Sequence, residues 1–155
     1  MYRKILIPTD GSAFSSTVAR AGVEFASQIK AEIMGLYVAP EYQYPVYVEV
    51  IPPTYPSEEE YQASMRKAGE SYLAKIREAA EAAGLNFSGF VTFSDATARE
   101  IAHTAEQHHC DLIFMGSHGR SGWGQLLLGS VTAKVLSICQ IPVLVQRLKK
   151  EAAHG

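Results

Sequence analysis

Five short apolar runs recur along the chain and alternate with segments of helical spacing. Runs of this length are typical of strands buried on both faces, as in a parallel sheet. They lie at residues 4–8, 32–38, 87–93, 112–115 and 142–145. Between them, apolar residues recur every three to four positions, which predicts four helices. These helices begin after Ser12, Ser15 or Ser16, after Ser57, at about residue 96 and near Ser130.

The order of these elements predicts the fold class. Strictly alternating strands and helices favour an α/β fold, a parallel sheet with right-handed crossovers and helices on both faces. The sequence holds no internal repeat, so we expect one domain over residues 1–148 and a polar tail over residues 149–155. Such sheets bind ligands at the carboxyl ends of their strands, where the strand order reverses.

One segment breaks the alternation. Residues 39–56 contain five prolines and four tyrosines and show no helical spacing. A loop this long in a compact domain is usually a lid, a binding loop or a self-packed segment. We expect the tyrosines at 42, 44, 47 and 55 to pack against one another. The run Glu58–Glu60 after Ser57 suits a helix start, and Gly84 suits its end.

Composition narrows the function classes. The formal net charge of the 155 residues is −2 and no basic stripe is present, so nothing favours nucleic-acid binding. No apolar run approaches the roughly 18 residues that a membrane span needs, so we expect no membrane insertion. The apolar run that follows Met1 to Lys4 is too short for a signal peptide. Cys110 and Cys139 lie far apart and fit reduced, partly buried thiols, which favours a cytoplasmic location.

A glycine-rich segment between the fourth strand and the last helix carries the candidate chemistry. Residues 116–132 contain five glycines and no Asp or Glu. Unpaired amides at a helix N-terminus bind anions, and the hydroxyls of Ser130 and Thr132 could add donors. Ser130 stands where a Walker A loop has lysine. The segment therefore predicts a phosphate site of backbone amides, aided by Arg120 or Lys134 and a divalent ion. The alternative is a flexible loop whose Ser130 caps the helix.

Three motifs make the sequence resemble the universal stress protein family. They are Gly116-x2-Gly119-x9-Gly129-Ser130, the segment at residues 7–12 and the segment at residues 141–145. The resemblance implies a Rossmann-like, three-layer, doubly wound five-stranded sheet of strand order 3-2-1-4-5. It also implies ATP, with Mg²⁺, across the carboxyl ends of strands 1 and 4. A homodimer through the edge strand Pro142–Val145, or a tetramer, follows from the same resemblance.

The resemblance also implies the nucleotide-binding residues. One group would lie at the adenosine: Pro8, Thr9, Asp10, Val38, Met115 and Gly116. Within it, Asp10 would lie near the ribose, and the backbone of Val38 would contact adenine. A second group would surround the phosphates: His118, Gly119, Gly129, Ser130, Val131 and Thr132.

Three functions remain open at this point. The first is an ATP-binding regulatory module of the stress response. The second is a slow ATPase or a protein that phosphorylates itself, for example on Ser117 or Ser121, although no catalytic residue is assigned. The third is a partner-binding scaffold with an empty nucleotide loop. For Asp10, a role in the turn or the helix cap is the alternative to ligand contact. The cluster His108, His109 and Cys110 does not favour a metal site, because adjacent residues at a helix end point in different directions.

Overall fold

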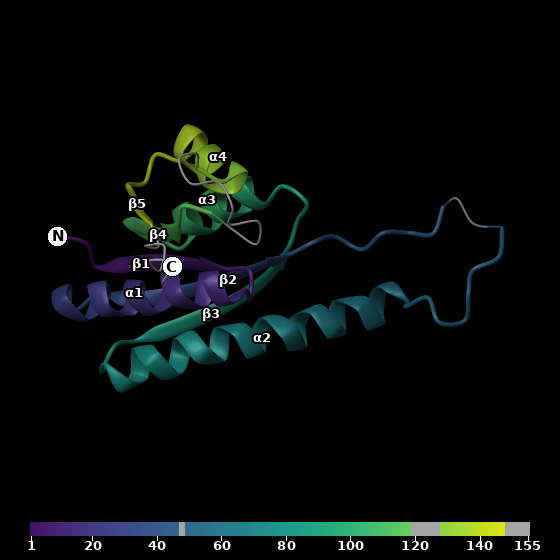
Figure 1. Cartoon of the computed structure of the whole chain (residues 1–155), viewed down its shortest axis with the longest axis horizontal. Helices are drawn as coiled ribbons and strands as arrows, with labels where there is room; N and C mark the ends of the chain where they lie inside the picture. The colour runs from purple at the N-terminus through teal and green to yellow at the C-terminus, as the bar shows by residue number, and fades with distance from the viewer. Residues whose placement is uncertain (47–48, 119–127, 148–155) are drawn as a thin grey trace, which may run out of the picture.

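The protein folds into a five-stranded parallel sheet with helices on both faces, as the sequence predicts (Figure 1). The computed structural model describes residues 1–46, 49–118 and 128–147. The strand order is β3-β2-β1-β4-β5, which confirms the expected order. The elements are β1 (Lys4–Thr9), α1 (Ala13–Ile29), β2 (Glu32–Ala39), α2 (Glu58–Ala82), β3 (Phe87–Phe93), α3 (Thr97–Gln107), β4 (Leu112–Gly116), α4 (Ser130–Ile138) and β5 (Val143–Gln146).

Two separate cores hold the three layers together. Alternation along β1 sends Ile5 and Ile7 to one face and Leu6 to the other, and all three are fully buried. The first face packs against α1 and α2, with Phe114 of β4 among its residues. The second packs against α3 and α4, where Val135 is fully buried. In Figure 1, α2 lies on one side of the sheet and α3 and α4 on the other.

Helix ends follow the predicted capping residues. The side chain of Ser12 accepts a hydrogen bond from the Ser15 amide, and that of Ser57 accepts one from the Glu60 amide at 3.1 Å. Gly84 follows α2 with φ +72°, a left-handed conformation that glycine adopts without strain. At α4 the cap is Gly129, and Ser130 is the first helical residue, so Ser130 does not cap the helix as the alternative interpretation supposed.

The tyrosine-rich segment forms an arm. In Figure 1 the chain between β2 and α2 extends away from the sheet together with the first turns of α2. The ring of Tyr42 contacts those of Tyr44, Tyr55 and Tyr61, at centroid distances of 5.1, 6.2 and 5.6 Å. The Tyr61 hydroxyl donates to the carbonyl of Pro40 at 2.6 Å. The expected self-packing is therefore confirmed for the described tyrosines; Tyr47 lies outside the described residues.

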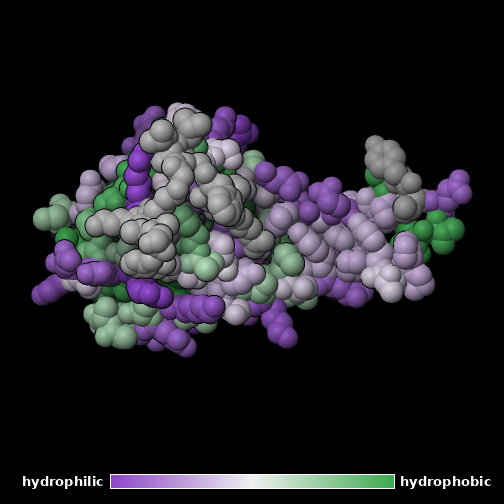
Figure 2. Space-filling view, in the orientation of Figure 1, coloured by the Kyte–Doolittle hydropathy of each residue, from purple (hydrophilic) through white to green (hydrophobic). Residues whose placement is uncertain are grey.

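The far end of this arm is apolar and exposed. Val46, Val50 and Ile51 have exposed fractions of 73%, 79% and 58%. Figure 2 shows the green of apolar residues at the far end of the arm, away from the body of the molecule. Among the described residues, no helix has both the length and the apolar character needed to cross a bilayer.

Close packing of α2 onto the sheet depends on Gly69. This residue is buried in the middle of α2, where a glycine is otherwise unfavourable by about 1 kcal/mol relative to alanine. A Cβ added there would lie 2.6 Å from the side chains of Tyr37 on β2 and Val91 on β3. Since this is shorter than any normal contact, the helix would have to move away from the sheet.

We therefore expect Gly69→Ala to destabilise the protein by about 1–3 kcal/mol, because overpacking outweighs the gain in helix propensity. Urea unfolding followed by circular dichroism measures the effect. Ser71→Ala, on the exposed side of the same helix, is the control and should change stability by under about 0.5 kcal/mol. Equal or greater stability of the Gly69→Ala variant would contradict the packing described above.

Candidate functional site

The sheet opens at the point where its strand order reverses. β1 pairs with β2 along its whole length, from Lys4 to Thr9. With β4 it pairs only through Ile5–Leu112 and Leu6–Ile113, within two strands that are both fully described. Pro8 lies two residues beyond, and a proline has no N–H to donate to a neighbouring strand. The carboxyl ends of β1 and β4 are therefore separate, and a crevice lies between them.

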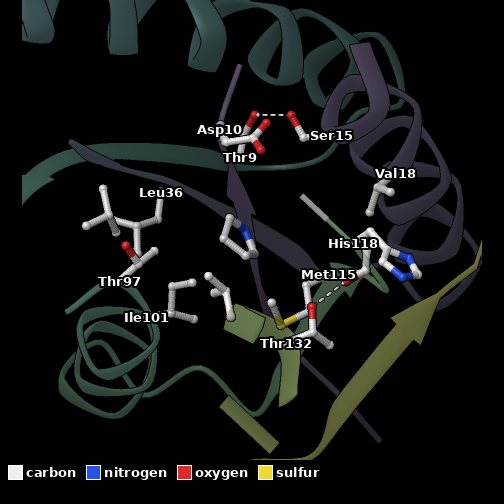
Figure 3. Close-up of a pocket in the computed structure, with 14 residues that line it drawn as sticks. Thr9, Asp10, Ser15, Val18, Leu36, Thr97, Ile101, Met115, His118 and Thr132 are labelled. Atoms are coloured by element: carbon white, nitrogen blue, oxygen red, sulfur yellow. Dashed lines mark hydrogen bonds between the residues drawn. The ribbon is translucent and has the colours of Figure 1, made fainter. Parts of the chain in front are cut away.

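A pocket occupies this crevice (Figure 3). Its lining comes from six elements and the turns that follow some of them: β1, α1, β2, α3, β4 and the start of α4. Nine of the residues predicted from the sequence line it, namely Pro8, Thr9, Asp10, Val38, Met115, Gly116, His118, Val131 and Thr132. The structure thus brings together residues that are more than 100 positions apart in the chain.

Three predicted residues are not part of this lining as the structure describes it. Gly129 and Ser130 are not among the described residues that line the pocket. Ser130 is exposed and borders a neighbouring depression together with Arg99 of α3 and Lys134 of α4. Gly119 lies outside the described residues, as do Arg120 and Ser121.

Sequence reasoning missed five lining residues: Ser15, Val18, Leu36, Thr97 and Ile101. Four carried no signal because each fits its own element's periodicity as a core or capping residue. Val18 lies on the core-facing side of α1, and Ile101 lies on the core-facing side of α3. Thr97 alone could have been found, because it begins the helix that follows β3 at the ligand edge of the sheet.

A network of short polar side chains fixes the turn after β1. The amide of Ser12 donates to Oδ1 of Asp10 at 2.9 Å, which closes a turn through the carboxylate. The hydroxyls of Thr9 and Ser15 lie 3.0 Å apart (Figure 3). Gly11 has φ +80°, and an added Cβ would meet the ring of Tyr72. The turn role considered for Asp10 is therefore present, and it holds the carboxylate at the rim of the pocket.

The opposite wall is tied together between β4, β5 and α4. The Ser117 amide donates to the carbonyl of Gln146 at 3.0 Å, and the Ser117 carbonyl accepts from the Gly129 amide at 2.7 Å. Thr132 is only 3% exposed, and its hydroxyl donates to the carbonyl of Gly116 at 2.7 Å. This bond joins α4 to the end of β4, and the role of the hydroxyl as a donor to a phosphate stays a prediction.

Backbone donors remain at the start of α4. In any α-helix the first amides have no acceptor within the helix, and here these belong to Ser130, Val131 and Thr132. The cap residue, Gly129, supplies no side-chain hydrogen bond to them. The helix dipole adds partial positive charge at the same point. This end of α4 therefore favours an anion.

His118 brings a further polar group to the pocket. Its Nδ1 lies 3.0 Å from the Ser117 hydroxyl. Its Nε2 is buried and has no hydrogen-bond partner among the described residues. In Figure 3 the ring lies on the same side of the pocket as Val18 of α1. A buried polar atom without a partner costs about 1–3 kcal/mol.

The rest of the lining is apolar. Leu36 and Val38 of β2, Ile101 of α3 and Met115 of β4 belong to or pack on the core between the sheet and the α3–α4 layer. An apolar floor with a few convergent polar groups is typical of a small-molecule site.

The cysteines and neighbouring histidines take no part in this site. Burial raises the pKa of the Cys110 thiol; the charge of Lys4 opposes this and those of Asp111 and Glu32 add to it, so that the pKa is about 11. The thiol is thus protonated at neutral pH. His108 stacks on Phe90, with ring centroids 4.7 Å apart. Within the described part of the chain, no group of three or more His, Cys, Asp or Glu could hold a metal ion.

A doubly wound parallel sheet with a ligand crevice at its switch point defines a class of small-molecule-binding α/β domains. Within that class, the chain belongs to the universal stress protein family, whose sequence model matches residues 1–147. It is 33% identical to universal stress protein MJ0531 of Methanocaldococcus jannaschii, over 97% of this chain and 85% of that protein. It is 29% identical to universal stress protein YxiE of Bacillus subtilis, over 95% of this chain and the whole of that protein.

Solved structures agree with this membership. Protein MJ0577 of M. jannaschii superposes with a TM-score of 0.79 and 28% identity, over 97% of this chain and 99% of that chain. An Arabidopsis thaliana protein of the family, solved with AMP bound, superposes with a TM-score of 0.64 at 15% identity, over 96% and 93% of the two chains. At that identity the likeness concerns the fold. Other structural neighbours of the family were solved in complex with cAMP and with dAMP.

The bond between Thr132 and Gly116 yields a stability prediction. Thr132→Val keeps the shape of the side chain and removes the donor, so we expect a loss of about 0.5–1.5 kcal/mol in the free energy of unfolding. Thr17→Val is the matched control, since the Thr17 hydroxyl donates to Ala13 on an exposed face of α1. Urea denaturation compares the two variants. A larger loss in the Thr17 variant would show that the buried bond does not anchor α4 to β4.

Proposed function

We propose that this protein binds ATP in the pocket between β1 and β4 and acts as a nucleotide-dependent module of the stress response. The observation that supports this most is the combination of an apolar floor with neutral donors at one end. The floor suits a flat base and its ribose. The first turn of α4 suits the phosphates, and His118 belongs to the same lining.

Adenine has an apolar ring face and polar edges. Val38 of β2 and Ile101 of α3 both line the pocket, and a planar ring bound there would pack against their side chains. Val38 lies near the end of a strand, where its backbone can bond the edge of the base. Asp10 at the rim would accept from a ribose hydroxyl, and its turn with Ser12 fixes it for that role.

The phosphates would be held without a lysine. The described residues that line the pocket include no Lys or Arg, so backbone amides and His118 supply the donors there. Mg²⁺ is usually bound through phosphates, water and one or two carboxylates rather than by a protein cage. Asp10 is the carboxylate that the described lining offers, which fits an ion carried in by the nucleotide.

Binding is better supported than turnover. A phosphoryl-transfer enzyme orients its nucleophile with a base or a positioned amide and neutralises charge with cationic side chains. Asp10 already accepts from the Ser12 amide, and Ser117, one of the serines considered for self-phosphorylation, is 4% exposed. We therefore propose reversible occupancy, with ATP altering the surface that a partner meets. The adenine nucleotides in related structures support a ligand of this class.

A filling substitution tests the adenosine position. Val38→Phe should lower ATP affinity at least tenfold, about 1.4 kcal/mol, because the added ring occupies the apolar floor. Val50→Phe, the same change on the exposed arm, should leave affinity unchanged. Isothermal titration with Mg-ATP measures both, and mass spectrometry of the small molecules released on denaturation identifies the natural ligand. A wild-type protein that neither retains nor binds an adenine nucleotide would refute the proposal.

The proposed function includes a homodimer through β5. This strand has β4 on one side and forms an edge of the sheet. The carbonyl of Pro142 accepts from Ile113 of β4 and that of Gln146 from Ser117 just after it, so the alternating backbone groups of Val143 and Val145 point outward. Exposed edges invite pairing, and Leu136 of the adjoining α4 is 43% exposed.

Val145→Pro should therefore weaken the dimer at least tenfold, since it removes an outward donor and leaves the β4–β5 hydrogen bonds in place. Sedimentation equilibrium measures the dissociation constant. Val145→Thr keeps both the donor and the β-branched shape and should dimerise like the wild type. If the proline variant associates as tightly as the wild type, the interface lies elsewhere.

A further inference from the structure

The arm between β2 and α2 is held in shape by its own polar groups. The hydroxyl of Tyr42 donates to the carbonyl of Pro56, and that of Tyr44 donates to the carboxylate of Glu58, each at 2.5 Å. These bonds join the half of the arm that follows β2 to the half that leads into α2. Together with the ring contacts of Tyr42 they fix the arm as a projection, so its far end is presented to the surroundings in an ordered form.

The far end of the arm combines aliphatic side chains with an acid. Its described residues Val46, Glu49, Val50 and Ile51, called the tip here, are all exposed. Figure 2 shows their apolar surface at a distance from the body of the molecule. Aliphatic side chains gain free energy only when water is removed from them, and an exposed apolar patch beside charged residues marks an interaction site. The tip therefore favours contact with another apolar surface.

The charge of the arm narrows the kind of surface that it can meet. Residues 39–65 contain five glutamates and no lysine, arginine or aspartate, so this stretch has a formal charge of −5. The whole chain has a formal net charge of −2, and the rest of it therefore carries +3. Because opposite potentials attract and like potentials repel across an interface, the partner surface has to be basic as well as apolar.

The chain itself offers such a surface. A depression lies between the first turns of α3 and α4. Its lining includes three apolar residues, two bases and one acid: Ala96, Ala98, Val131, Arg99, Lys134 and Asp95. Both bases are exposed, and Val131 is 37% exposed. Neither helix has a side-chain cap, and both helix dipoles add partial positive charge at this place. The depression thus matches the tip in apolar character and opposes it in charge.

The arm and the depression lie at the same edge of the sheet. The arm leaves the carboxyl end of β2, while α3 and α4 begin beyond the carboxyl ends of β3 and β4. The amide of Glu41, at the base of the arm, donates to Oδ1 of Asp95 at 3.0 Å. Figure 1 shows the arm extending away from α3 and α4, so a tip does not reach the depression of its own chain. A twofold axis that brings two such edges together places each arm along the other copy, and both contacts then form at once.

We propose that the protein self-associates through its arms, with the tip of each copy docked in the depression between α3 and α4 of a second copy. In this contact Glu49 of one copy faces Lys134 of the other, and the aliphatic side chains of the tip pack against the apolar part of the lining. The contact is separate from the pairing of β5 and does not require a nucleotide.

The apolar part of the contact is tested by sedimentation equilibrium without nucleotide. The Val145→Pro protein is the background, because the association that remains there is expected to come from the arms. Adding Val50→Asp should weaken this association at least tenfold, since it places a charge on an apolar contact. Ser71→Asp adds the same charge on the exposed side of α2 and should leave the dissociation constant unchanged. A Val145→Pro protein that is monomeric, or one that Val50→Asp does not affect, would overturn the proposal.

The charged part is tested by exchanging the two charges in the same background. Glu49→Lys and Lys134→Glu should each weaken association about three- to tenfold, because each places like charges opposite one another. The double variant restores an opposite pair and should return to within about twofold of the background protein. Glu78→Lys, an exposed residue of α2 outside the arm, is the control and should have no such effect. A double variant as weak as the two single effects combined would show that the residues do not meet.

A cross-link locates the tip on the second copy. Val50→Cys protein is mixed with Lys134→Cys protein under mild oxidation, both carrying Cys139→Ala; Cys110 is 4% exposed and is left in place. We expect a disulfide-linked dimer in this mixture and none when Lys75→Cys, on the exposed side of α2, replaces Lys134→Cys. Equal linkage in both mixtures, or none in either, would count against docking in the depression. These readouts involve no nucleotide, so they hold whether or not the pocket binds ATP.

Discussion

The separation of two neighbouring strands is the constraint on which the site depends. β1 lies at the centre of the sheet, and its first half is fixed by the two cores, with Ile5, Leu6 and Ile7 fully buried. Its second half pairs with β2 but not with β4. Pro8 contributes because it offers no N–H at the place where a continued ladder would need one. A strand order that reverses here carries the connections to opposite faces, so nothing in the sheet fills the gap.

The polar residues around this gap divide into two groups. Thr9, Asp10, Ser15 and Thr132 direct hydrogen bonds to the protein itself and so fix the walls of the pocket. The first amides of α4 and Nε2 of His118 have no such partner among the described residues. Leaving donors unpaired lowers the stability of the empty protein, and a ligand that accepts from them recovers that free energy. The same contrast separates hydroxyls that bond within the protein from donors that are left for a ligand.

Much of the fold could be predicted because it depends on local rules. Buried strands show as apolar runs, and Ser12 and Ser57 mark helix starts through their own hydrogen bonds. The glycine-rich segment and the end of β1 indicated the correct edge of the sheet. Ser15, Leu36 and Ile101 could not be found in this way, because a residue that faces a core and one that faces a pocket follow the same periodicity. The tertiary bond of Thr132 and the reach of the arm beyond the sheet also depend on contacts that no local pattern encodes.

The character of the donors bears on what occupancy would do. Under the proposed function, the phosphate end of the described lining relies on backbone amides and a histidine rather than on lysine or arginine. Neutral donors stabilise an anion through direction and burial, so ionic strength screens them less than it screens exposed charges. They also give little help to the charge redistribution of phosphoryl transfer, for which enzymes rely on cationic groups and positioned bases. Under the proposed function, such a site retains a nucleotide without consuming it. The response of the protein then depends on the nucleotide concentration, because only bound nucleotide acts on the wall that β4, β5 and α4 form together.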